Sequence, residues 1–156
     1  MNVRFDKYLI SLAAVLGFTL SACDDCSDMD MRATAPISFS IVDDDGNDLL
    51  ASSKARYSVD SIRLFDNDSQ KSIVVTNVYF PGLKSYVFYA DCDKNGQGKS
   101  SLRLQFNSVD SDTLEVWYEQ EKNACANVYK YTQFRHNGES VKKSPLTSAL
   151  LIVKAK

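Results

Sequence analysis

The sequence predicts an all-β protein, a single antiparallel β-sandwich of about seven or eight strands. Short segments alternate apolar and polar residues, which is the period of a strand with one buried face. Turn-forming residues separate these segments at short intervals. No segment shows a sustained helical period, and 16 of the 17 aromatic residues are Tyr or Phe, which favour strands. Two sheets that each bury one face against the other satisfy this pattern.

The predicted domain spans residues 36–156, and its first element is a hairpin. Pro36 marks the start, because proline lacks a backbone N–H and suits the edge of a strand. Ile37, Phe39 and Ile41 then alternate with serines. The turn DDDGND follows, in which Gly46 can adopt a positive φ.

Further segments with strand character follow this hairpin. Pro81-Gly82 and Asn137-Gly138 are turn signals between them, and the second pair is typical of a tight hairpin. The predicted strand segments are 62–64, 72–80, 85–90, 102–106, 114–118, 127–134 and 148–155.

The first 22 residues have the organisation of a secretory signal peptide. Arg4 and Lys7 form a basic head, and a 15-residue apolar run follows from Tyr8 to Ala22. That run is shorter than the roughly 20 residues of a spanning helix. It ends in Leu20-Ser21-Ala22-Cys23, which resembles the lipobox of bacterial lipoproteins. The resemblance implies cleavage before Cys23, attachment of lipid to its sulfur, and durable membrane anchoring. The alternative is a conventional or uncleaved signal with a free Cys23.

Cys23 and Cys26 have the C-x-x-C spacing of a redox pair or half a zinc site. A lipidated Cys23 has no free thiolate, so the resemblance argues against both interpretations. Residues 23–35 are then a lipidated acidic tether containing Asp24, Asp25, Asp28 and Asp30. This cluster is either a solvated spacer or an address.

Clustered acidic residues after the cysteine resemble the export signal of Bacteroidota-type surface lipoproteins. That resemblance implies the Gram-negative outer membrane and a surface-exposed domain, with the periplasmic face as the alternative. In other Gram-negative systems an Asp directly after the cysteine is linked to retention at the inner membrane. The 14 residues ISFSIVDDDGNDLL also resemble the first hairpin of immunoglobulin-like or transthyretin-like domains of secreted bacterial proteins.

The net charge argues against nucleic-acid binding. The full chain has a net charge of −2, and removal of residues 1–22 leaves 16 basic and 19 acidic residues, a charge of −3. A phosphate-backbone partner selects a basic surface, so no nucleic-acid partner is expected.

Three cysteines remain after Cys23, and an envelope location permits disulfides. Cys92 and Cys125 flank predicted strands, and their pairing closes a loop that contributes roughly 3–4 kcal/mol in the loop-entropy model. We expect this pair. Cys26 is an alternative partner for either residue or for another chain, and a fully reduced set is the remaining alternative.

The segment DCDKNGQGKSSL contains the start of a calcium-loop pattern. Asp91, Asp93 and Asn95 occupy alternate positions, and Gly96 follows. Leu102 stands where a bidentate Glu is required, so a long hairpin loop is the simpler interpretation. No cofactor is expected, with a partial calcium site as the alternative.

Aromatic residues are the other binding candidates. If Leu114 and Val116 face the core, Trp117 points out of the sheet and can stack on a sugar or anchor a protein. Tyr118 and Tyr129 are further candidates, and burial in the core is the alternative. The single histidine, His136, is expected to be an exposed turn residue.

Two tripeptides complete the candidate sites. Asp60-Ser61-Ile62 and Asp112-Thr113-Leu114 resemble the O-glycosylation motif of Bacteroidota-type envelope proteins, which implies modification of Ser61 or Thr113. The function predicted from all these observations is a membrane-anchored, non-catalytic module that binds a glycan or a protein. A structural or assembly component of the envelope is the alternative, and a small hydrolase is less favoured.

Overall fold

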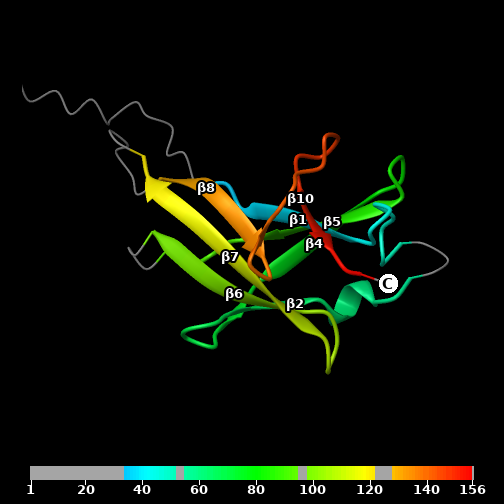
Figure 1. Ribbon diagram of the computed structural model, residues 1–156, viewed down its shortest axis with the longest axis horizontal. Coiled ribbons are helices and arrows are strands. Elements are labelled where there is room, and N and C mark those ends of the chain that lie inside the picture. The colour runs from blue at the N-terminus through cyan, green and yellow to red at the C-terminus, as the bar shows by residue number, and fades with distance from the viewer. Residues whose placement is uncertain (1–33, 52–54, 95–97, 122–127, 156) are drawn as a thin grey trace, which may run out of the picture. The chain divides into compact units, whose positions relative to one another are not determined.

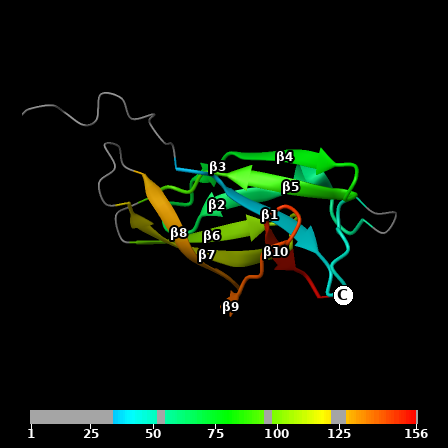
Figure 2. The ribbon, with the colours of Figure 1, turned by 90° about the horizontal axis from the view of Figure 1, so that it is seen from above.

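The computed structural model describes residues 34–51, 55–94, 98–121 and 128–155, which form two packed β-sheets (Figures 1 and 2). The all-β sandwich is confirmed. The four-stranded sheet has the order β10-β1-β5-β4, with β1 Ile37–Val42, β4 Val75–Phe80, β5 Ser85–Ala90 and β10 Leu150–Val153. The six-stranded sheet has the order β3-β2-β6-β7-β8-β9, with β2 Arg63–Asp66, β3 Ser72–Ile73, β6 Lys99–Gln105, β7 Ser111–Gln120, β8 Tyr129–His136 and β9 Glu139–Ser140.

The core lies between the facing sides of the two sheets. Phe39 on β1 and Phe88 on β5 stack with their ring centroids 5.3 Å apart. Alternate residues of the six-stranded sheet meet them, and the fully buried ones include Leu64, Leu102, Leu104, Leu114 and Val116. Alternation therefore selected the inner face correctly, because successive side chains of a strand point to opposite sides.

Two features of the sheets differ from the prediction. The first and last strands, β1 and β10, pair in parallel, so the sandwich is not wholly antiparallel. The predicted strand 72–80 is two strands in different sheets, because β3 pairs with β2 while β4 pairs with β5. Composition signals strand character but does not specify the partner of a strand, and partner choice depends on tertiary packing.

The turn predictions are confirmed by the backbone. Gly46 has φ +82°, and its N–H donates to the carbonyl of Asp43 over 2.9 Å. Asn137 and Gly138 both have positive φ, at 49° and 86°, as a type I′ hairpin requires. They connect β8 to β9. The finer resemblance to immunoglobulin-like or transthyretin-like domains stays a prediction.

Helical structure in the described ranges is limited to one 3₁₀ turn, η1, at Val59–Ser61. Within the part of the chain that the structure describes, no helix has the length and apolar character needed to cross a bilayer. The predicted signal peptide, Cys23, Cys26 and the tether up to residue 33 lie outside the described residues.

Candidate functional site

The outer face of the six-stranded sheet carries a set of basic and aromatic side chains. Alternate residues of β2, β6 and β7 are buried, and Phe134 and His136 of β8 are half-buried, so the residues between them point away from the core. The outward side chains of these strands include Arg63, Phe65, Lys99, Arg103, Glu115, Trp117, Gln133 and Arg135. Four of these are basic and one is acidic, on a chain whose net charge is −2. We call this set the outer face.

Three guanidinium groups of the outer face have no carboxylate partner among the residues that the structure describes. Arg63 donates to the carbonyls of Asp60 and Ile62 over 2.7 and 2.8 Å. Arg103 lies over the ring of Phe65, 4.8 Å from its centroid, and its Nη2 donates to Gln70 Oε1 over 3.3 Å. Its buried Nε has no hydrogen-bond partner among the described residues. These cations are held in place by neutral groups, so their charge is available to an anion.

Trp117 points outward, as the alternation predicted, and two cations lie over its ring. The Nζ atom of Lys99 is 4.8 Å from the indole centroid, and the guanidinium carbon of Arg135 is 5.4 Å from the same point. Lys99 also forms an ion pair with Glu115. Because Lys99 is on β6 and Arg135 on β8, they approach the indole from the strands on either side of β7. Both cations lie over the indole, so the ring is not a free stacking surface for a sugar.

The backbone positions of Arg63, Arg103 and Arg135 form a diagonal line across the strands. In the strand register, Arg63 lies opposite Gln105, which is two residues along β6 from Arg103. Arg135 lies opposite Glu115 of β7, and Glu115 in turn lies opposite Ser101 of β6. From strand spacing and rise, the backbone of Arg103 is about 8 Å from that of Arg63 and about 12 Å from that of Arg135. An elongated anion fits such a line better than a compact one.

Tyr118 is not an exposed binding residue. Its side chain is 4% exposed and meets Tyr129 edge-on, with ring centroids 5.6 Å apart. The strand period that buries Leu114 and Val116 also turns Tyr118 inward. Tyr129 is half-buried, and the ammonium group of Lys94 lies 5.9 Å from its ring centroid. Neither ring therefore presents the open stacking surface that was predicted.

Cys92 is a free, buried thiol in this structure. Its burial raises the pKa of the thiol to about 12, so the thiolate is strongly disfavoured. The predicted partner Cys125 lies outside the described residues, as does Cys26. No disulfide occurs in the described part of the chain, and the Cys92–Cys125 pairing stays a prediction.

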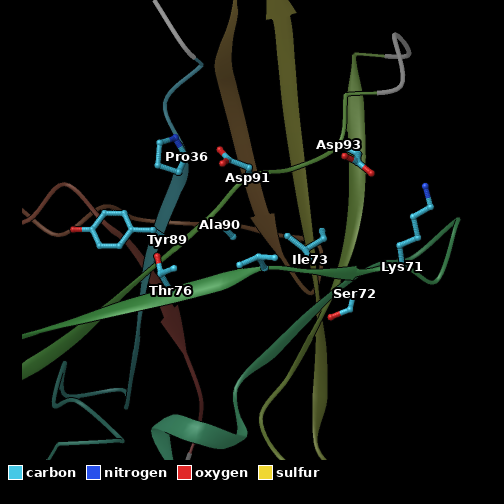
Figure 3. Close-up of a pocket in the computed structure, with 10 residues that line it drawn as sticks. Pro36, Lys71, Ser72, Ile73, Thr76, Tyr89, Ala90, Asp91 and Asp93 are labelled. Carbon is cyan, nitrogen blue, oxygen red and sulfur yellow. The ribbon is translucent and has the colours of Figure 1, made fainter.

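A groove of about 430 Å³ lies beside the segments that cross between the sheets. It is lined by the chain from β3 into β4 and by the end of β5, including Val74, Thr76 and Tyr89. Asp91 and Asp93 line the side opposite Ser72 and Thr76 (Figure 3). We call it the end groove.

The calcium prediction falls at this groove. Asp91 and Asp93 are both exposed, and no cluster of three His, Cys, Asp or Glu residues suited to a metal occurs among the described residues. Asn95 lies outside those residues. The two carboxylates that are described supply a local negative charge and do not by themselves form an oxygen cage.

A partly buried charge network was missed by the sequence interpretation. We define the Lys154 network as Tyr57, Asp110, Asp112, His136 and Lys154. The ammonium group of Lys154 is 2.9 Å from Asp110 Oδ1 and 3.0 Å from Asp112 Oδ2. His136 Nε2 is 2.8 Å from Asp112 Oδ2, and the Tyr57 hydroxyl donates to Asp110 Oδ2 over 2.5 Å.

His136 is therefore not an exposed turn residue, which corrects the prediction. It is the last residue of β8, and its side chain is 11% exposed. The Asn137-Gly138 turn was read correctly, but the strand extends up to it. Pairing of β8 with β7 directs the imidazole toward Asp112, which a local pattern could not reveal.

Each charged group of the Lys154 network has an ion-pair or hydrogen-bond partner within the network. Burial opposes ionisation of Asp112, but hydrogen bonds from Asn137, Lys154 and His136 outweigh it and hold its pKa below the ordinary value. Burial likewise opposes the charge of Lys154, and the two carboxylates raise its pKa above the ordinary value. The groups satisfy one another and none lines the end groove, so a structural role explains them.

The two candidate glycosylation residues have different surroundings. Ser61 lies in η1, and its hydroxyl donates to the carbonyl of Ser58 over 2.7 Å or to that of Phe106 over 2.5 Å. Thr113 is exposed on β7. Thr113 is thus the more accessible hydroxyl, and modification of either residue stays a prediction.

Comparison of the chain with protein-family models, with curated proteins and with solved structures gave no match.

Proposed function

We propose that this protein is a non-catalytic module whose outer face binds an acidic, extended polysaccharide. The observation that carries the proposal is the diagonal of Arg63, Arg103 and Arg135, three guanidiniums without a carboxylate partner in the described chain. Guanidinium groups bind carboxylates and sulfates through paired, charge-assisted hydrogen bonds. Uronic acid or sulfated sugars carry such groups at regular intervals along a chain.

A glycan is a better candidate than a nucleic acid for two reasons. The chain is acidic overall, with a pI of about 5.4, so its long-range field opposes every polyanion, and it opposes a densely charged one most. Duplex DNA carries one charge per roughly 1.7 Å of its axis, a higher density than a polysaccharide with one charge per sugar. Binding of single strands also relies on open aromatic faces for base stacking. The indole of Trp117 is instead flanked by Lys99 and Arg135.

We also propose where in the cell the protein is anchored. The lipobox at Leu20–Cys23 and the acidic residues after it support a lipid-anchored domain on the Gram-negative outer membrane, presented at the cell surface. There the outer face would meet polysaccharides directly. Intact-mass analysis of the protein from its native host tests this part: a mass that begins at Cys23 and includes acyl chains is expected, and a chain retaining Met1 with a free thiol would overturn it.

The binding proposal is tested by titrating the full-length chain with polygalacturonate, using dextran as the neutral control. Binding to polygalacturonate that weakens as salt increases is expected, because exposed charges are screened. Arg103→Gln and Arg135→Gln should each weaken it about tenfold, since a hydrogen bond between charged groups contributes roughly 1.5–3 kcal/mol. Lys142→Gln, an exposed site outside the outer face with the same change of charge, should have little effect.

Three results would contradict the proposal. The first is absence of polygalacturonate binding at low salt. The second is an equal loss of affinity in Lys142→Gln and in the two arginine variants, which would indicate a net-charge effect. The third is equal binding of single-stranded DNA with the same arginine dependence, which would indicate a general polyanion site.

A further inference from the structure

The edge of the four-stranded sheet formed by β4 is open and unusually apolar. Strand β4 pairs with β5 on one side, and no described strand pairs with its other side (Figure 2). Its sequence VTNVYF contains no charged residue and no proline. Natural proteins normally protect a long edge strand with such residues or with a bulge. This edge lacks those devices, so it is suited to pairing with another strand.

The other three sheet edges are less suited to pairing. Strands β3 and β9 are two residues long. Strand β10 is covered on its outer side, where Lys143 bridges Leu150 and the N–H of Leu151 donates to the carbonyl of Lys142. Strand β8 is also open from Tyr129 to Gln133, beyond the two residues that pair with β9, but this stretch carries Lys130. Among the described strands, β4 is therefore the longest open edge without a charged residue.

The hydrogen bonds of β5 show which groups of β4 point outward. Tyr86 accepts from the hydroxyl of Ser40 on β1, and its N–H donates to Asp48, so its backbone groups face away from β4. Tyr79 is directly opposite Tyr86. The N–H and C=O of Tyr79 must therefore face outward, and the strand alternation places those of Asn77 and Val75 on the same side.

We propose that the β4 edge pairs with β4 of a second copy of this chain in an antiparallel, two-fold arrangement. A two-fold axis at Asn77 places Asn77 opposite Asn77 and Val75 opposite Tyr79 of the second copy. This register uses every outward backbone group of the strand. An axis at Val78 would instead oppose Val75 to Pro81, which has no N–H to donate.

The exposed apolar side chains support a second copy as the occupant. Val78 is 47% exposed and Tyr79 41%, although most large apolar residues of the described chain are buried. In the proposed register Tyr79 meets Val75 of the second copy, and Val78 lies beside Thr76. Val74, which is 81% exposed, comes next to Phe80 of the second copy. The edge is thus complementary to itself, as an isologous interface requires.

Charges at the two ends of the strand are also complementary, since Asp91 and Asp93 outnumber Lys71 in the end groove. Asp91 and Asp93 follow Ala90, which pairs with Val75 at the start of β4. Lys84 lies in the exposed turn after the other end of the strand. Antiparallel pairing brings the turn of one copy to the end groove of the other, so Lys84 approaches the carboxylates of the second copy. An interface centred on one six-residue strand is small, so we expect a dissociation constant in the micromolar range.

Sedimentation velocity of the full-length chain in density-matched detergent tests the proposal. A reversible shift from monomer to dimer between about 1 and 100 μM is expected from that micromolar affinity. Val78→Lys should remove the dimer, because the two lysines lie diagonally across the axis, about 7–8 Å apart, where they repel each other and protect the edge. Thr113→Lys, on an exposed residue of the other sheet, should leave it unchanged. Circular dichroism establishes that both variants are folded.

Hydrogen exchange tests the register without any substitution. The amides of Asn77 and Tyr79 should become protected as the concentration of the chain rises, whereas that of Val74, beyond the strand, should not. A chain that is monomeric at 100 μM and exchanges both amides freely would overturn the proposal. A dimer that persists in Val78→Lys, or whose Asn77 and Tyr79 amides remain unprotected, would also overturn it, because the interface would then lie elsewhere.

Discussion

Replacement of Lys154 by methionine is the substitution expected to affect stability most through electrostatics. Its ammonium group lies between Asp110 and Asp112, at 2.9 and 3.0 Å, and 4.5 Å from the centroid of the Phe106 ring. Methionine retains most of the apolar stem but leaves two neighbouring carboxylates without their cation. Because the Lys154 side chain is 13% exposed, this is close to the situation of a broken buried ion pair.

The magnitude follows from that burial. Removal of one partner of a buried ion pair costs about 3–5 kcal/mol, and residual solvent contact reduces this to about 2–4 kcal/mol. For a domain of this size the melting temperature should fall by roughly 10 °C. The measurement is urea unfolding of Lys154→Met and the wild type at pH 7. Lys142→Met is the exposed control, and its stability should change by less than about 0.5 kcal/mol.

The pH dependence separates charge from packing. The pKa values of Asp110 and Asp112 are lowered in the fold, because hydrogen bonds to the charged forms outweigh the opposing effect of burial. Their stabilisation is therefore present above the ordinary value of 3.8 and is lost as the pH falls through the lower folded values. The difference between Lys154→Met and the wild type should shrink strongly at pH 2–3. An equal difference at pH 7 and at acidic pH would refute the electrostatic reasoning, as would a change below about 0.5 kcal/mol at pH 7.

Three further predictions concern individual groups. Burial and Asp110 raise the pKa of the Tyr57 hydroxyl to about 12. Its neutral form therefore stabilises the fold below pH 10, and this stabilisation is lost as the pH rises toward 12. Tyr57→Phe should reduce the fall in melting temperature between about pH 9 and 11.5. The buried thiol of Cys92 should react with a thiol reagent far more slowly in the native chain than in urea, as site-resolved mass spectrometry will measure; equal rates would contradict its burial. Gly138 has φ +86°, so Gly138→Ala should destabilise the chain by about 1 kcal/mol in urea, whereas Gly82→Ala, with open space and no positive φ, should have little effect.

The inner face of the sandwich could be read from the sequence. Alternation identified Ile37, Phe39 and Ile41, and likewise Leu102 and Leu104, as core residues, because a strand with one buried face must repeat every two residues. The same pattern placed Trp117 on the outside. The same alternation places Tyr118 on the inner face with Leu114 and Val116, so its prediction as an exposed binding residue was inconsistent with the pattern itself.

The sequence by itself therefore determined the class of fold, the turns at Gly46 and Asn137-Gly138, and the side of the sheet on which Trp117 lies. These properties depend on neighbouring residues alone. Tertiary structure decided which strands pair, the parallel contact of β1 with β10, and the division of residues 72–80 between two sheets. It also decided the Lys154 network and the diagonal of arginines, because each unites side chains from strands that are distant in the chain. Strand partners are chosen by packing over the whole domain, and no local pattern encodes that choice.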